Sequence, residues 1–168
     1  MSPGVLFQTH LVLGYLVWLL CFGTYGLPWL RAMDRAAAHR LIATLHSFRF
    51  FGLVFILPGV VGPNLPASFA TVAAYGDFAT GLLAIAALLT VRMRALFWFF
   101  VAAFNLVGIA DLMLDYYHAT QIGLPEVAGQ LGAAYAIPIL YVPVLMITHI
   151  VALSWLMRPQ TRLAGNVA

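Results

Sequence analysis

The sequence predicts an all-α membrane protein, a single domain over residues 1–168 in which five helices cross the bilayer. Three observations predict it. Of the 168 residues, 64% are hydrophobic and only 8% are charged, and the mean hydropathy of +0.99 is far above that of soluble domains. The apolar residues gather in five long segments. They lack the alternation of polar and apolar residues that a transmembrane barrel has. Helices are therefore the structure in which their backbone N–H and C=O groups can all be hydrogen-bonded within lipid.

The arginines predict the orientation of these helices. All eight basic residues are arginines, and seven of them lie in three clusters at alternate boundaries between the apolar segments. The clusters are Arg31, Arg35 and Arg40, then Arg92 and Arg94, then Arg158 and Arg162. Because basic loops stay on the cytoplasmic side of a membrane, we expect the N-terminus outside and the C-terminus inside.

The first two helices are expected at residues 5–27 and 41–61. The first ends at Gly26-Leu27-Pro28, before the charged stretch that carries the first arginine cluster. Pro58-Gly59 breaks the second, and an uncharged turn follows it.

The other three helices are expected at residues 68–91, 95–117 and 133–157. Ser68 is a suitable N-cap for the first of them. The polar stretch 121–130 is expected to form an outer loop before the last helix.

Two ionisable residues are expected near the middle of the bilayer. Arg49 lies nine residues past Arg40, and Asp77 lies nine residues past Ser68. At 1.5 Å per residue each is about 13–14 Å deep in a hydrocarbon core about 30 Å thick. An unpaired charge there costs several kcal/mol, so we expect an Arg49–Asp77 ion pair. The sequence leaves open whether this pair is functional or only holds two helices together.

Small residues share the expected face of Asp77, which should therefore point into the bundle rather than toward lipid. They are Ala70, Ala73, Ala74, Gly81 and Ala84. On the next helix Asn105 lies at a similar depth, and Asp111 and Asp115 continue a polar stripe toward the outer surface.

Three histidines are expected within the bundle. His46 precedes Arg49 by three residues and should share its face of the helix. His149 is about 12 Å from the inner end of the last helix, so it can meet His46 near Arg49. His10 lies near the outer end of the first helix, at a depth comparable with Asp111.

We therefore expect a polar site that binds a small ligand or passes protons or a small solute. The candidate residues are Arg49, Asp77 and Asn105 at the midplane, His46 and His149 below them, and Asp111 and His10 along the outer approach. An Arg–Asp pair can exchange partners, and histidine titrates near neutral pH. Pro138 and Pro143 kink the outer half of the last helix, which favours either a vestibule or closer packing.

Two other functions stay open. In a b-type haem protein, His46 and His149 would be the axial ligands and Arg49 would lie near a propionate. In an accessory subunit of a membrane complex, the polar cluster would only stabilise the fold. Enzyme activity is less favoured, because no catalytic triad, phosphate-binding glycine loop or metal-binding motif is found.

Composition restricts the partners and cofactors. The basic residues lie at helix ends, where they meet lipid headgroups rather than nucleic acid. The absence of lysine excludes a retinal Schiff base, and the single Cys21 excludes an internal disulfide and sites built on several thiolates. A homo-oligomer or a larger membrane complex stays open.

Several strings resemble a group of small bacterial polytopic membrane proteins that have no known activity. The strings are His46-Ser47-Phe48-Arg49 with Gly52, Leu65-Pro66-Ala67-Ser68-Phe69 leading to Tyr75-Gly76-Asp77, Asn105 with Gly108 and Asp111, and Pro138 with Pro143 and His149. The resemblance covers residues 46 to about 157, although Phe104 stands where the group has tryptophan. It implies a multi-pass protein of the bacterial inner membrane and implies no reaction.

Overall fold

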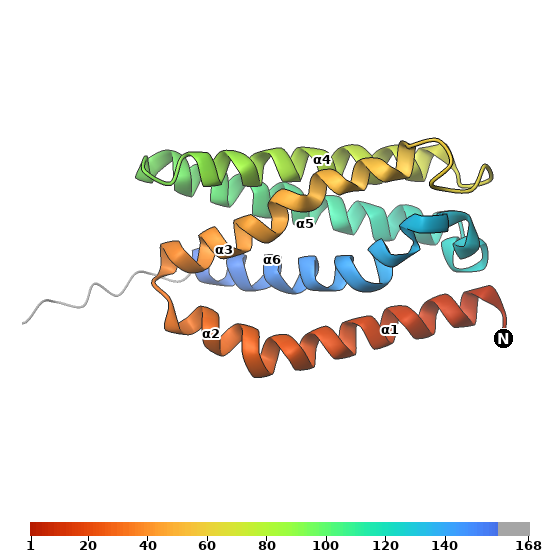
Figure 1. Ribbon diagram of the computed structural model, residues 1–168, viewed down its shortest axis with the longest axis horizontal. Coiled ribbons are helices and arrows are strands. Elements are labelled where there is room, and N and C mark those ends of the chain that lie inside the picture. Colours follow the sequence, from red (N-terminus) through yellow and green to blue (C-terminus); the bar gives the residue numbers. More distant parts are fainter. Residues whose placement is uncertain (158–168) are drawn as a thin grey trace, which may run out of the picture.

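The computed structural model describes residues 1–157, and within them the chain is helical without any strand. Successive helices run back and forth along one long axis and form a single bundle (Figure 1). Four helical stretches are long and apolar enough to cross a membrane: Pro3–Ala32, Ala67–Leu89, Arg94–Gln121 and Ile137–Leu156. The predicted all-α class is confirmed, and these four stretches fit a membrane protein.

The first stretch consists of three helices in sequence. α1 (Pro3–Cys21) continues through the short π-helix η1 (Phe22–Gly26) into α2 (Leu27–Ala32). The expected end at Pro28 is therefore too early. Pro28 directly follows η1, where the Leu27 amide bonds the Phe22 carbonyl five residues earlier, and this local π-helix accommodates the missing N–H of the proline.

The second pass along the bundle is not one α-helix. α3 (Arg35–Ser47) is followed by the 3₁₀-helix η2 (Phe48–Ile56). A 3₁₀-helix has three residues per turn, so every third residue shares a face. The buried residues of η2 follow this period, because they are Arg49, Gly52 and Phe55.

The structure therefore does not confirm the prediction of five transmembrane α-helices. Arg35 already begins α3, because Asp34 caps that helix by accepting a hydrogen bond from the Ala37 amide at 2.9 Å. Neither α3 nor η2 alone is long enough to count as a membrane-spanning helix.

α4 (Ala67–Leu89) packs against both η2 and α5 (Arg94–Gln121). The face of α4 that carries Asp77 is buried, as the small residues beside it predict. Its small members, all buried, are Ala70, Ala73, Ala74, Gly81 and Ala84.

Most of the polar stretch expected as an outer loop lies instead in the 3₁₀ segment η3 (Leu124–Tyr135), which is interrupted by non-helical backbone angles at Val127 and Gly132. Its apolar residues recur every three or four positions and are buried, which anchors the segment to the bundle. The Gly132 backbone has φ +53° and lies against the Val60 carbonyl, a conformation and a closeness that favour glycine. The Ala133 amide donates to that carbonyl at 3.1 Å.

The last pass begins later than residue 133. It consists of the π-helix η4 (Ile137–Tyr141) and α6 (Val142–Leu156). Pro143 has no N–H to offer the Ile139 carbonyl four residues earlier. That carbonyl packs against Gly14 of α1, where a Cβ atom would overlap it.

Trp18 of α1 stabilises this irregular region, because its indole Nε1 donates to the Leu140 carbonyl at 2.7 Å. We expect Trp18→Phe to lower the free energy of unfolding by about 0.5–1.5 kcal/mol, since the aromatic packing stays and the hydrogen bond is lost. Thermal unfolding of the purified protein measures the change. Trp29→Phe, at an exposed position on α2, is the matched control and should leave the melting temperature unchanged.

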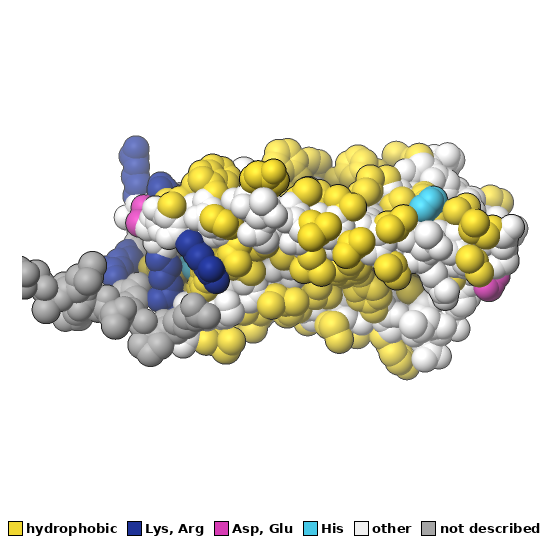
Figure 2. Space-filling model, turned by 90° about the horizontal axis from the view of Figure 1, so that it is seen from below, with side chains coloured by type: hydrophobic (Ala, Val, Ile, Leu, Met, Phe, Trp, Pro, Cys, Tyr) yellow, Lys and Arg dark blue, Asp and Glu magenta, His cyan; other side chains and the backbone are white. Residues whose placement is uncertain are grey.

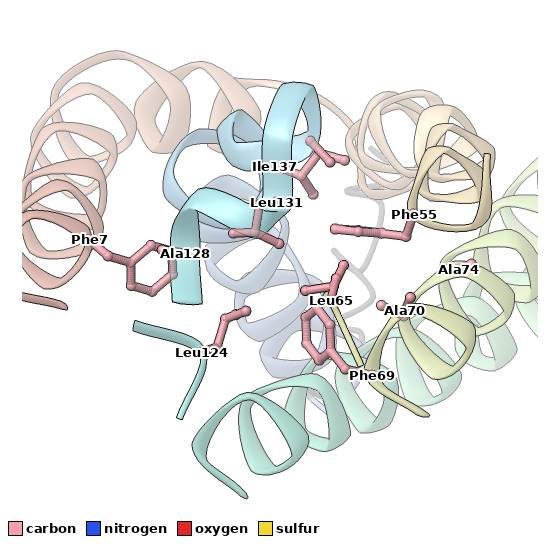
Figure 3. Close-up of a cluster of buried hydrophobic side chains, with 12 residues drawn as sticks. Phe7, Phe55, Leu65, Phe69, Ala70, Ala74, Leu124, Ala128, Leu131 and Ile137 are labelled. Atoms are coloured by element: carbon pink, nitrogen blue, oxygen red, sulfur yellow. The ribbon is translucent and has the colours of Figure 1, made fainter. Parts of the chain in front are cut away.

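Two apolar clusters occupy the two ends of the bundle. Phe7, Phe55, Phe69, Leu131 and Ile137 belong to the cluster at the end that holds the N-terminus, where side chains from distant segments point toward one another (Figure 3). The other cluster is built from buried side chains of α2, α3, α4, α5 and α6.

The basic side chains gather at the end of the molecule opposite the N-terminus (Figure 2). The α2–α3 and α4–α5 connections both lie at that end (Figure 1). The arginines beside these connections are Arg31, Arg35, Arg40, Arg92 and Arg94. Arg158 and Arg162 lie outside the described residues.

Candidate functional site

Arg49 is the centre of a buried ion network. Its side chain is fully buried, and its Nε donates to Asp77 Oδ1 at 2.5 Å. Its Nη2 donates to a carboxylate oxygen of Asp111, and its Nη1 donates to the Gly108 carbonyl at 3.3 Å. The predicted Arg49–Asp77 ion pair is confirmed, and the structure adds a second carboxylate to it.

His149 extends the network by one more step. Arg49 Nη1 lies 3.2 Å from His149 Nε2. Because a guanidinium only donates, Nε2 must accept, which leaves the imidazole proton on Nδ1. Nδ1 then donates to Asn105 Oδ1 at 2.9 Å, and the Asn105 amide donates to the Val101 carbonyl at 2.8 Å. The geometry therefore fits a neutral His149.

His46 lies beside His149 but makes different contacts. The two ring centroids are 3.9 Å apart with an interplanar angle of 37°. His46 Nε2 lies 3.0 Å from Thr148 Oγ1, whose hydroxyl has the Val144 carbonyl as an acceptor at 2.7 Å. His46 Nδ1 is buried and has no hydrogen-bond partner within the described part of the chain.

This arrangement of the two histidines does not fit the haem alternative. A metal–imidazole bond is about 2 Å long, so two axial nitrogens are about 4 Å apart and their ring centres are farther apart still. The His46 and His149 ring centroids are only 3.9 Å apart, and the rings lie against each other. Both ring nitrogens of His149 are already occupied by Arg49 and Asn105.

Three glycines allow the network to form. A Cβ atom on Gly52 of η2 would overlap the Asp77 carboxylate, and one on Gly76 of α4 would overlap the Asp111 carboxylate. A Cβ atom on Gly108 of α5 would overlap the His149 ring. The helices therefore approach closely where the charged groups meet.

A cavity of about 450 Å³ adjoins the network, toward the end of the bundle that holds the N-terminus. Three acidic residues, Asp77, Asp115 and Glu126, are among those that line it. The remaining wall is mostly apolar and aromatic, and none of the described residues that line it is basic. Asp77 therefore lines the cavity and also forms an ion pair with Arg49.

The structure brings together six of the seven candidate residues and leaves one apart. Arg49, Asp77, Asp111, His149 and Asn105 are joined by hydrogen bonds, and His46 stacks on His149. His10 instead faces η3, where its Nδ1 lies 3.0 Å from the Tyr135 hydroxyl. His10 is not among the residues that line the cavity.

Three residues of this region are not among the candidate site residues that the sequence predicts. Asp115 follows Asp111 by four residues, so the polar stripe of α5 contained the signal for it. Glu126 was placed in a loop, and only the folding of η3 brings it to the cavity wall. Thr148 carries no charge and gave no signal in the sequence.

Comparison with known proteins gives a family but no activity. No curated protein matches the chain, and no solved structure matches it. One family model does match, over residues 6–157, and its description is Domain of unknown function (DUF8737). This agrees with the resemblance to proteins without known activity. Because the match covers most of the chain, the protein belongs to the family described as Domain of unknown function (DUF8737).

Proposed function

We propose that the protein is a multi-pass protein of the bacterial inner membrane that binds a small ligand in the cavity beside Asp77. The single observation that carries the proposal is the double role of Asp77. Its carboxylate holds Arg49, and the same residue lines the cavity, so a ligand in the cavity changes the surroundings of the buried ion network.

The proposed topology has five crossings, with the N-terminus outside. α3 has 13 residues and spans about 20 Å, and η2 has nine and spans about 18 Å at 2.0 Å per residue. Together they exceed a hydrocarbon core of about 30 Å. The arginines at one end of the bundle support a cytoplasmic position for that end (Figure 2). The cavity then opens toward the outer side.

Binding is favoured over passage of a solute in this conformation. The half of the bundle that carries the arginines is filled by buried apolar side chains, among them Ile42, Phe97 and Phe104. A proton or solute that entered the cavity would meet this packed layer beyond the ion network. Passage would therefore need a second conformation in which the layer opens.

The substitution Asp77→Asn tests the proposal. We expect it to abolish ligand binding and to leave the protein folded, because Arg49 keeps Asp111 as an ion-pair partner. Native mass spectrometry of the purified protein measures the bound fraction of any small molecule that co-purifies. Filling the cavity through Ala73→Phe should remove the same adduct.

The control for Asp77→Asn is Asp34→Asn. Asp34 is exposed and caps α3, and asparagine caps a helix as well as aspartate does, so this variant removes a carboxylate without affecting the cap or the cavity. It should retain the adduct. An adduct that persists unchanged in both Asp77→Asn and Ala73→Phe would contradict the proposal.

A role as an accessory subunit is the second candidate, and one observation favours it. The donors of Arg49 in η2 reach acceptors on α4, α5 and α6, so the network also holds these four elements of the fold together. In that case Asp77→Asn would lower the melting temperature, and a partner protein would co-purify with the wild type without any small-molecule adduct.

A further inference from the structure

We infer that the cavity binds an organic cation with an apolar body, and that its positively charged group lies against Asp115 and Asp77. The inference rests on the proposed function and adds the chemical class of the ligand. It is carried by the charge of the cavity wall, by the apolar and aromatic surface around that charge, and by an unpartnered carboxylate oxygen.

Carboxylates outnumber basic groups in this region. Arg49 is fully buried and directs its donors to Asp77 and Asp111. Asp115 lies one helical turn beyond Asp111 on α5 and takes part in neither ion pair found among residues 1–157. Its Oδ1 is buried and has no hydrogen-bond partner in the described chain. A buried oxygen of this kind is costly unless a donor or a cation reaches it.

The rest of the wall suits an apolar ligand. Phe7, Phe55 and Phe69 contribute aromatic rings from three different elements, and Tyr116 lies next to Asp115 on α5. Aromatic faces attract alkylammonium groups, most strongly where water is excluded. A volume of about 450 Å³ is within the range of small-molecule sites.

The same wall argues against an inorganic cation or an anion. A calcium ion takes about 6–8 oxygen ligands and magnesium about six, and the mostly apolar wall offers too few. An anion would meet Asp77, Asp115 and Glu126 without any basic side chain among the described lining residues. Charge complementarity therefore selects a cation, and the apolar surface selects an organic one.

The test compares two molecules of nearly the same shape. Benzyltrimethylammonium carries a permanent positive charge, and neopentylbenzene is its neutral isostere with carbon in place of nitrogen. Binding of each to the purified full-length protein in detergent is measured by equilibrium dialysis, with empty micelles as the blank. We expect the cation to bind to the wild type at least about tenfold more tightly than the neutral molecule.

Asp115→Asn should weaken binding of the cation by about tenfold and leave binding of the neutral isostere unchanged. Asp115→Glu, which keeps the charge, should restore most of the affinity. Asp34→Asn removes a carboxylate at the opposite end of the bundle and should change neither measurement. Melting temperatures recorded in parallel verify that each variant is folded.

The wild-type comparison alone can overturn the inference, whatever the variants do. Equal binding of the two molecules, lost in Ala73→Phe, would show a neutral apolar site, so the class of ligand would be wrong while the ligand-binding cavity stood. No binding of benzyltrimethylammonium would also overturn the inference. The proposed function fails separately, through a co-purified adduct that is insensitive to Asp77 and Ala73.

Discussion

Replacing Arg49 with methionine should destabilise the protein by about 3–5 kcal/mol, because removing one partner of a buried ion pair leaves the other charge uncompensated. Here two carboxylates, those of Asp77 and Asp111, lose their guanidinium together, and the Gly108 carbonyl loses a donor. Thermal unfolding in detergent, followed by tryptophan fluorescence, measures the effect. We also expect a large fall in the yield of folded protein.

Two further variants separate the loss of the buried ion pair from a general sensitivity to losing arginine. Arg40→Met changes an exposed arginine of α3 and should leave the melting temperature almost unchanged. The triple variant Arg49→Met, Asp77→Asn, Asp111→Asn removes both signs of charge and should recover much of the lost stability. If Arg49→Met has the same melting temperature as the wild type, the network contributes nothing to stability and the interpretation is wrong.

Gly108→Ala should also be strongly destabilising, by about 1–3 kcal/mol, because it inserts a methyl group into a closely packed site. A Cβ atom at position 108 would overlap the His149 ring and approach Thr80. Moving His149 away breaks its contacts with Arg49 and Asn105, so the cost includes two buried hydrogen bonds. The midpoint of thermal unfolding measures the change.

Gly23→Ala provides the matched control for this substitution. Gly23 also lies in a helical segment of an apolar stretch, but an added Cβ would meet nothing within 4 Å beyond its chain neighbours and the backbone of its own helix. Alanine is more favourable than glycine within a helix, so this variant should be as stable as the wild type or slightly more stable. Equal stability of Gly108→Ala and Gly23→Ala would show that the helices around His149 can separate without cost.

Counting residues from the ends of helices located the centre of the site. Arg49 and Asp77 were placed at matching depths, and their ion pair is present. This worked because charged residues are rare in such segments and depth in a helix is proportional to the residue count. The same reasoning brought His149 to Arg49 and Asn105 to the same region.

Residues whose positions depend on irregular backbone could not be predicted in this way. The change from α3 to η2 alters both the rise and the number of residues per turn, and a count that assumes 1.5 Å per residue does not follow it. Asp111 was expected along the outer approach, but the long Arg49 side chain reaches it. His10 depends on the fold of η3, which brings Tyr135 beside it.

The three-residue period of η2 restricts the length of this segment as firmly as it restricts its composition. One residue inserted between Arg49 and Gly52 would rotate everything beyond it by about 120°. Gly52 would then turn away from Asp77, and a phenylalanine would lie against the Asp77 carboxylate in its place. Insertions and deletions of a single residue should therefore be poorly tolerated in η2.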